Sequence, residues 1–445
     1  MIETASGAVG RLLRSSWLLW GALALAHLWL SFLNLHDDVH PLGDVTLVYR
    51  PWMEQGFDAR SWVGIDQPWV YPVLAIVPML LAWTFGPENY AYTWLAMVTA
   101  LDAVAFGFLI GWRGTARNAV AAWWWLGFLV LLGPVALARL DSVTVPLAIV
   151  GALFVASRPR CAGAILTVAA WIKVWPGAII VAIVVATRQR WRVLVSAVLT
   201  SIVIAGLALV VGSGANVLSF VTQQAARGLQ IEAPVSTPWL WQAAAGARHA
   251  RVYYDTAMLT FQVTGDGADA VSALMTPLLA LAVLAILLLA LLAVRARVPA
   301  TQLLAPLALA LVTAVIAFNK VGSPQYLLWL TVPVILGLLS PPAHRSFRAP
   351  AAMTLLLAFM TQLIYPTLYD GLLALHTVPL VLLTLRNLLL FVLLAWSIAA
   401  MWGAIRAFDR TGNARSRDRL EEGRPEDDRL EPHRRDEQGL GKHGG

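Results

Sequence analysis

The chain has 445 residues, of which 59% are hydrophobic and 13% are charged, and its formal net charge is +7. A soluble domain carries about 25% charged residues, so this composition leaves too little polar surface for a soluble fold. Apolar blocks such as residues 273–294 are close to the ~20 residues that cross the hydrocarbon core of a bilayer. The sequence therefore predicts an all-α, polytopic membrane protein of about 10–12 transmembrane helices.

The positive charge does not indicate a nucleic-acid partner, because the arginines lie between apolar blocks, which is typical of cytoplasmic loops. A single cysteine, Cys161, excludes an intramolecular disulfide and a cysteine-based metal site. The histidines are scattered, and neither a phosphate-binding glycine loop nor a dinucleotide fingerprint occurs. We expect no cofactor and no metal-ligand set.

The candidate membrane segments, in chain order, are 16–33, 71–85, 90–112, 118–137, 142–156, 162–187, 192–212, 271–294, 299–318, 325–340, 350–368 and 376–405. Segments 71–85 and 325–340 are short for a full span. Segment 162–187 is long for one helix and contains Lys173 and Pro176. Because proline removes a backbone donor and disrupts the preceding turn, a broken helix or tight hairpin is expected there.

The arginine clusters between the segments orient the chain, since such clusters face the cytoplasm. The loops 34–68 and 213–270 then face outward, together with short stretches around residues 139–141, 173, 319–325 and 366–376. An outward loop 34–68 and a cytoplasmic Arg113 require an odd number of crossings between them, but two apolar segments lie there. We therefore expect segment 71–85 to dip into the membrane without crossing it.

The chain divides into one transmembrane domain, residues 1–405, and a charged tail, residues 406–445. The tail has almost no large apolar residues. Such a segment cannot bury enough surface to offset its ordering entropy, so we expect a disordered cytoplasmic tail.

Lysine is used only three times, at Lys173, Lys320 and Lys442, and the first two lie within or beside apolar segments. A cation at membrane depth is costly unless it is paired or hydrated, which makes it a functional candidate. A compact ammonium is also a suitable partner for a phosphate. The alternative is that each lysine snorkels from a helix end.

Acidic residues in the outward loops divide into candidates and ordinary loop residues. Asp44, in the first outward loop, could act as a general base toward an acceptor hydroxyl, or it could cap a helix or turn. For Asp58 and Asp66 an ordinary loop role is favoured. Most tryptophans near the interfaces are expected to belong to aromatic belts.

Two charged pairs remain open from the residues alone. Arg139 and Asp141, at a helix start, either pair with each other, or one of them faces a ligand and the other holds it. Arg227 and Glu232, in the large loop, either bind an anion and a sugar hydroxyl or shape the loop.

The order of these features between apolar segments resembles a known family. The features are Gly43-Asp44 through Tyr49, Tyr71-Pro72, Arg139-x-Asp141, Lys173 with Pro176, Arg227-Gly228, and Lys320 through Tyr326. Over residues 10–405 the chain resembles the actinobacterial polyprenyl-phosphate-mannose-dependent mannosyltransferases, glycosyltransferase family eighty-seven, which have the GT-C fold. Some members use a histidine in a late outward loop; the Lys320 segment has none, and His376 is a weak substitute.

The resemblance implies an inverting glycosyltransferase that moves a sugar, mannose in that family, from a polyprenyl phosphate to a glycolipid or lipoglycan of the cell envelope. Asp44 would be the catalytic base, and Lys173, Lys320, Arg139 and Arg227 would bind the donor phosphate. We expect substrate contacts from Asp141, Gln230, Glu232, Gln325 and Tyr326. The protein would lie in the plasma membrane with its active site on the periplasmic or extracellular side.

Two other functions would use a similar chain. A transporter or lipid flippase also needs intramembrane charges, but such proteins usually show repeat symmetry, and none is visible in this sequence. A non-catalytic scaffold or partner subunit would not need charges gathered on one face.

Overall fold

The computed structural model describes residues 10, 12–37, 40–225, 227–256, 258–340 and 346–422. Within this part of the chain, eight helical segments are long and apolar enough to cross a membrane. They contain α2 (Ser16–His36), α5 (Tyr90–Ile110), α6 (Ala119–Leu132), α10 (Arg190–Val210), α13 (Ala268–Arg295), α14 (Ala300–Ala317), α16 (Arg348–Gln362) and α18 (Thr377–Glu422). The protein is therefore a mostly helical, multi-pass membrane protein, as the sequence predicts.

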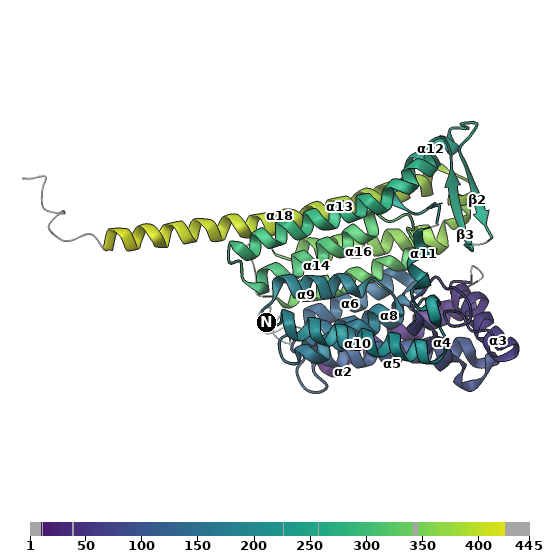
Figure 1. The fold of residues 1–445 in the computed structure, drawn as a ribbon, viewed down its shortest axis with the longest axis horizontal. Helices are drawn as coiled ribbons and strands as arrows, with labels where there is room; N and C mark the ends of the chain where they lie inside the picture. Colours follow the sequence, from purple (N-terminus) through teal and green to yellow (C-terminus); the bar gives the residue numbers. More distant parts are fainter. Residues whose placement is uncertain are drawn as a thin grey trace, which may run out of the picture.

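Large apolar side chains cover the outside of this bundle. Leu207 on α10 and Leu281 on α13 are 63% and 61% exposed. Apolar side chains facing outward along whole helices are expected where lipid, and not water, surrounds the protein. Side by side, α13 and α18 form one flank of the bundle (Figure 1).

Four shorter apolar helices run beside the eight long ones. They are α7 (Asp141–Phe154), α8 (Pro159–Ile172), α9 (Pro176–Ala186), and α15 (Thr331–Leu339) with the 3-10 turn Pro324–Leu330 before it. A 14-residue helix is only ~21 Å long, which is less than the ~30 Å hydrocarbon core. A helix of this length does not cross the hydrocarbon core by itself.

The expected break in segment 162–187 is confirmed. Helices α8 and α9 form a hairpin, and Lys173 at the break has the extended backbone angles φ −152° and ψ 133°. Pro176 is the first residue of α9, where its missing N–H costs nothing.

Segment 71–85 stays at one end of the bundle, as the charge distribution predicts. Its helical part, residues 73–85, contains α4 (Ile76–Ala82). At its far end, Trp83 stacks on Phe57 of α3 (Arg50–Ala59), with ring centroids 5.2 Å apart, and lies 6.1 Å from Tyr90 at the start of α5. Helix α5 then runs to the opposite end, where the Ser16 N–H donates to the carbonyl of Gly114.

A small antiparallel sheet, in the order β1-β3-β2, stands on the same end of the bundle as α3 and α4 (Figure 1). Its strands are β1 (Leu229–Gln230), β2 (Arg251–Asp255) and β3 (Thr260–Thr264), and helices α11 (Ser219–Ala225) and α12 (Thr237–Ala244) accompany it. This sheet is an exception to the all-α prediction. Strands of two to five residues carry a weak local signal, and tertiary contacts stabilise them.

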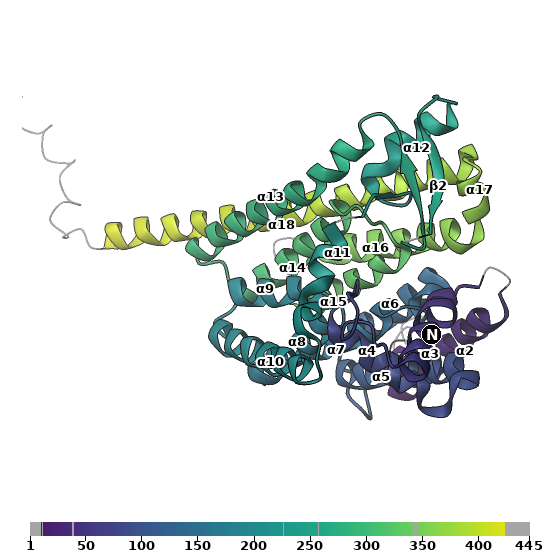
Figure 2. The same cartoon turned by 45° about the vertical axis from the view of Figure 1, so that its right-hand side comes forward.

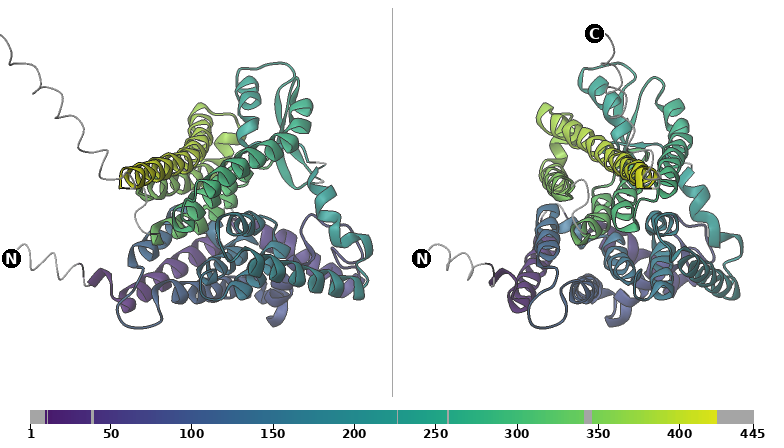
Figure 3. Two further views of the ribbon diagram at one scale, coloured as in Figure 1. Left: turned by 60° about the vertical axis from the view of Figure 1, so that its left-hand side comes forward. Right: turned by 90° about the vertical axis from the view of Figure 1, so that its left-hand side faces the viewer.

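The helices form two groups, with α2 to α10 in one and α13 to α18 in the other (Figures 2 and 3). Between the groups, α14 packs on α9, and α15 and α16 pack on α6. At the end opposite the sheet, α18 extends beyond the bundle and continues to Glu422. Helix thus covers residues 406–422 of the segment for which disorder was expected. The remaining tail lies outside the described residues.

Candidate functional site

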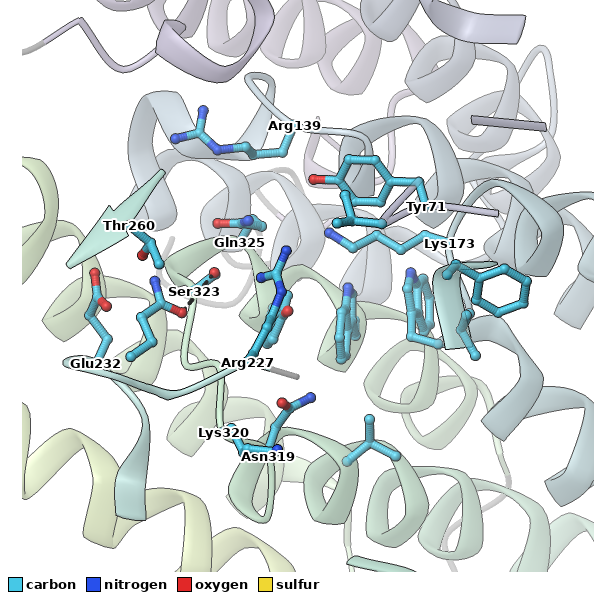
Figure 4. A pocket seen from close by; sticks show the side chains of 18 of the residues that line it. Tyr71, Arg139, Lys173, Arg227, Glu232, Thr260, Asn319, Lys320, Ser323 and Gln325 are labelled. Atoms are coloured by element: carbon cyan, nitrogen blue, oxygen red, sulfur yellow. Dashed lines mark hydrogen bonds between the residues drawn. The ribbon is translucent and has the colours of Figure 1, made fainter. Parts of the chain in front are cut away.

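A cavity of about 830 Å³ lies at the sheet-bearing end, where the two helix groups meet. Nine of the ten predicted site residues line it: Asp44, Arg139, Lys173, Arg227, Gln230, Glu232, Lys320, Gln325 and Tyr326. Each of the four short helices has an end at or next to residues that line the cavity. Figure 4 shows Arg139 and Lys173 approaching from one side and Arg227 from the other.

Asp44 opens a π-helical turn, Asp44–Tyr49, that leads into α3. Its Oδ2 accepts a bond from Arg139 Nε at 3.0 Å, and its side chain is 37% exposed. Arg139 is buried, and its Nη1 donates to the carbonyls of Pro41 and Ala138, both at 2.7 Å. The arginine therefore fixes the carboxylate at the cavity edge without covering it.

Asp141 does not line the cavity. The alternative in which it pairs with Arg139 is wrong. Asp141 is fully buried at the start of α7 and accepts bonds from Lys173 Nζ and Trp329 Nε1, both at 2.5 Å. The two-residue spacing from Arg139 carries the side chains apart at this helix start, and the α8–α9 break brings Lys173 to Asp141 instead. Asp141 is a positioning residue for Lys173.

Aromatic rings complete the setting of Lys173. Its Nζ lies 5.7 Å from the ring centroid of Tyr71 and 5.3 Å from that of Tyr326, which are cation–π distances. Trp329 stacks on Tyr326 at 4.2 Å and on Trp175 at 5.7 Å. The ammonium is thus held rigidly on the cavity wall.

Arg227 and Lys320 line the opposite wall, on segments that follow α11 and α14. Nε of Arg227 is buried and has no hydrogen-bond partner among the described residues. Burial lowers the pKa of Lys320. Both side chains are cations in a partly dehydrated place, which is where a cation gains most from binding an anion.

The large loop and the Lys320 loop are joined at their backbones. The Gln230 N–H donates to the carbonyl of Lys320 at 3.0 Å, and the Gly322 N–H donates to Gln230 Oε1 at 3.0 Å. A Cβ on Gly322 would collide with the backbone of Glu232 and Ala233. Glycine at this position therefore allows the two loops to touch and places Gln230 and Lys320 together.

Glu232 is the innermost carboxylate of this wall. It is 2% exposed, and its Oε1 accepts a bond from the Tyr369 hydroxyl at 2.9 Å, while its Oε2 has no partner among the described residues. Burial raises its pKa, against the opposing effects of Tyr369 and of Arg386. Arg386 Nη2 also donates to the Glu232 carbonyl at 3.4 Å.

Several residues around the site escaped the sequence analysis. Arg386 and Asn387 are buried in the apolar segment that forms α18, so the rule that selected Lys173 would have selected them. The same rule applies to His27 and Asp102, which pair at 3.0 Å between α2 and α5. Tyr365 and Tyr369 line the cavity from a kinked segment with no recognisable sequence pattern.

One side of the cavity is apolar and runs between membrane helices. Its lining includes Ala178 and Val181 of α9, Leu279 and Val283 of α13, and Val315 of α14. Val181 of α9 is 39% exposed. We call this apolar side of the cavity, between α9, α13 and α14, the α9–α13 groove.

Other candidates lie apart from this cavity. Asp58 is exposed on α3, and Asp66 Oδ2 accepts a bond from the Trp62 N–H at 2.7 Å, so both have the ordinary roles favoured for them. His376 does not line the cavity. Among the described residues no group of three or more His, Cys, Asp or Glu side chains is placed to hold a metal ion.

The comparisons with known proteins indicate no function, so the function is inferred from the site. No protein-family model matches the chain, and neither the curated proteins nor the solved structures contain a match.

Proposed function

We propose that this protein is a membrane glycosyltransferase. It would transfer a sugar, mannose by the family resemblance, from a polyprenyl phosphate to a glycolipid or lipoglycan acceptor, with inversion. The observation that carries the proposal is the cavity, in which a partly exposed carboxylate and four cations converge where an apolar groove opens between membrane helices.

The donor would use both parts of the cavity. Its hydrocarbon chain fits the α9–α13 groove, because both are apolar. Its phosphate would bind among cations that line the same cavity, namely Arg227, Lys320 and Lys173. Asp141 balances the charge of Lys173, so Lys173 contributes less attraction than an unpaired cation would.

One proton and one electron pair move in the proposed reaction. The acceptor hydroxyl oxygen attacks the anomeric carbon while Asp44 takes the hydroxyl proton. The bond between that carbon and the phosphate oxygen breaks, and its electron pair stays on the polyprenyl phosphate. The cations stabilise this departing charge, and such preorganised stabilisation in a dry site is usually the largest catalytic term. Arg139 orients Asp44, and Glu232, Gln230 and Gln325 offer hydrogen bonds to sugar hydroxyls.

The side of the membrane follows from the arginine distribution. The cavity opens at the end that bears the loops 34–68 and 213–270, opposite the arginine-rich ends of the helices. On the rule that such arginines face the cytoplasm, the transfer would take place on the periplasmic or extracellular side.

The test is transfer of radiolabelled mannose from synthetic polyprenyl-phosphate-mannose to a membrane lipid extract by the purified protein. Asp44→Asn keeps an oxygen for Arg139 but removes the base, and a general base contributes about 10²–10⁴ in rate. We expect labelled lipid with wild type and with the matched control Asp58→Asn, and a loss of that size with Asp44→Asn.

Transfer by Asp44→Asn at the wild-type rate would remove Asp44 as the base. Absence of transfer by all three proteins would refute the proposed donor. Movement of the labelled donor between leaflets of vesicles without transfer would then favour the transporter or flippase.

A further inference from the structure

One chain segment leads from helix α6 to Arg139, and helix α2 holds the start of this segment. The segment begins with the 3-10 turn Gly133–Ala136, three residues before Arg139. Asn34 of α2 donates from Nδ2 to the carbonyl of Pro134 in this turn and to the carbonyl of Leu30 in its own helix, both at 2.9 Å. Asn34 is 5% exposed, so a buried asparagine ties the turn to α2.

Helix α16 contacts the same turn. The amide group of Gln362, the last residue of α16, packs against Gly133, where an added Cβ would collide with Gln362 Oε1. Gly133 also has a φ of +74°, which glycine adopts without strain. The turn thus touches both helices, and we call the turn together with Asn34 and Gln362 the clamp.

The chain segments that leave the clamp meet again at the cavity. Arg139 donates from Nε to Asp44 and from Nη1 to the carbonyl of Pro41, and both partners follow α2 in the chain. Its Nη2 donates at 3.4 Å to the hydroxyl of Tyr365, which lies three residues after Gln362. The segment from α6 therefore contacts the segments from α2 and α16 twice, first in the clamp and then beside the proposed base.

The connection between the clamp and Arg139 is short and buried. Only Leu137 and Ala138 lie between the turn and Arg139, and neither is exposed. The Leu137 carbonyl accepts the Nε1–H of the equally buried Trp94 at 2.9 Å. A displacement of the turn is therefore passed on to Arg139 and, through the 3.0 Å ion pair, to Asp44.

The polar atoms of the clamp favour a role in placing the turn over a role in overall stability. Oδ1 of Asn34 and Oε1 of Gln362 are buried and have no hydrogen-bond partner among the described residues. A buried acceptor without a partner costs stability, and apolar side chains of similar shape avoid that cost. Rules of this kind are broken most often where function requires it.

We propose that Asn34 is a positioning residue for the transfer reaction. By holding the turn after α6, it places Arg139 and thereby sets the position of Asp44 against the acceptor hydroxyl. This inference rests on the proposed function, in which Asp44 is the base. Asn34 does not line the cavity, so it acts through Arg139 and touches no substrate.

The kinetic test is Asn34→Leu, which removes both donated bonds at similar side-chain volume. A misplacement of about 1 Å costs roughly 100-fold in rate, so kcat should fall by up to about that factor. KM for the donor should stay as in wild type, because Arg227 and Lys320 lie on other segments. Trp124→Phe is the matched control: it removes the 2.9 Å bond from Nε1 to the carbonyl of Ala351, which joins the same helices α6 and α16, and kcat should not change.

The variant Arg139→Gln separates positioning from a general effect on the fold. If Asn34 acts through Arg139, Asn34→Leu should lower kcat much less in the Arg139→Gln protein than in wild type. A purely structural role would lower kcat by the same factor in both proteins. Gln362→Ala loosens the clamp without removing a hydrogen bond between described residues, and it replaces Asn34→Leu in this test if that variant does not fold.

Amide hydrogen exchange of the full-length protein in micelles tests the clamp without turnover. Residues 41–45 and 135–140 should exchange faster in Asn34→Leu than in wild type, whereas Gln230 on the opposite wall should not change. Unchanged exchange in residues 41–45, equal effects of Asn34→Leu and Trp124→Phe, or an equal loss of kcat with and without Arg139 would overturn the inference. If transfer fails in every protein while exchange changes as described, the proposed function fails and the clamp stands.

Discussion

The buried ion pair between Lys173 and Asp141 offers variants that distinguish an effect on folding stability from an effect on donor use. Asp141 is fully buried, the side chain of Lys173 is 13% exposed, and their charged atoms are 2.5 Å apart. In Asp141→Asn the amide oxygen can still accept the N–H of Trp329, so the main change is the loss of the negative charge. Lys173 is then left as an unpaired cation in the cavity wall.

The expected cost follows from this geometry. Removing one partner of a buried pair costs about 3–5 kcal/mol, because the other charge stays buried without compensation. Lys173 borders the cavity, where water can reach its ammonium, so we expect the lower end of that range. Replacing both partners, as in Asp141→Asn with Lys173→Met, should recover most of the loss, since no buried charge remains.

The assay is unfolding of the purified protein in mixed detergent micelles, followed by tryptophan fluorescence. Glu54→Gln is the control, because its pair with Arg50 is about 40% exposed on both sides and should contribute little. If Asp141→Asn unfolds like Glu54→Gln, the pair does not stabilise the α8–α9 break and the reasoning is wrong. The double variant should recover stability but not donor use, because the phosphate has lost Lys173.

Three further predictions concern the opposite wall. Burial raises the pKa of Glu232, so the fold favours its protonated form. The stability of the wild-type protein should therefore fall as the pH rises through that raised pKa. Melting curves of Glu232→Gln, in which the side chain resembles the neutral acid, should lack this fall. A parallel fall in both proteins would contradict it. Burial lowers the pKa of Lys320, so the rate of donor use should decline at a lower pH than it would with an ordinary lysine. Lys320→Arg stays charged, so in pH–rate profiles it should move this decline to higher pH. An unchanged profile would exclude Lys320 as a binding group for the donor phosphate. Gly322→Ala should lower both thermal stability and transfer, because its Cβ meets the backbone of Glu232, whereas Gly206→Ala on α10, with open space around it, should leave both near wild type; equal effects would disprove the close loop contact.

The length of the helices connects the fold to the site. Long helices of 18 residues or more carry the protein through the bilayer, while the four short ones end at the cavity. Helix ends inside the bundle place charged residues there, which is how Lys173 and Asp141 come to form a buried pair. The shortness of segment 325–340 and the break near Pro176 were thus the clearest local signals of the site in the sequence.

The sequence by itself determined the membrane class, the succession of apolar segments and the break near Pro176. The reason is that the length of an apolar segment and the positions of the arginines between segments are local properties of the chain that act directly on its insertion into the bilayer. Rare lysines in apolar surroundings marked Lys173 and Lys320 for a similar reason: the cost of a charge at depth is high wherever the chain folds.

Only the tertiary structure decided how the charges are paired. Asp44 meets Arg139 from 95 residues away, and Lys173 meets Asp141, whereas the sequence neighbours Arg139 and Asp141 remain apart. Pairing of charges depends on which helix ends arrive at the same place, and that is set by packing of apolar surfaces distant in the chain. The cavity has the same origin, because a cavity is a property of several helices together and of no single segment.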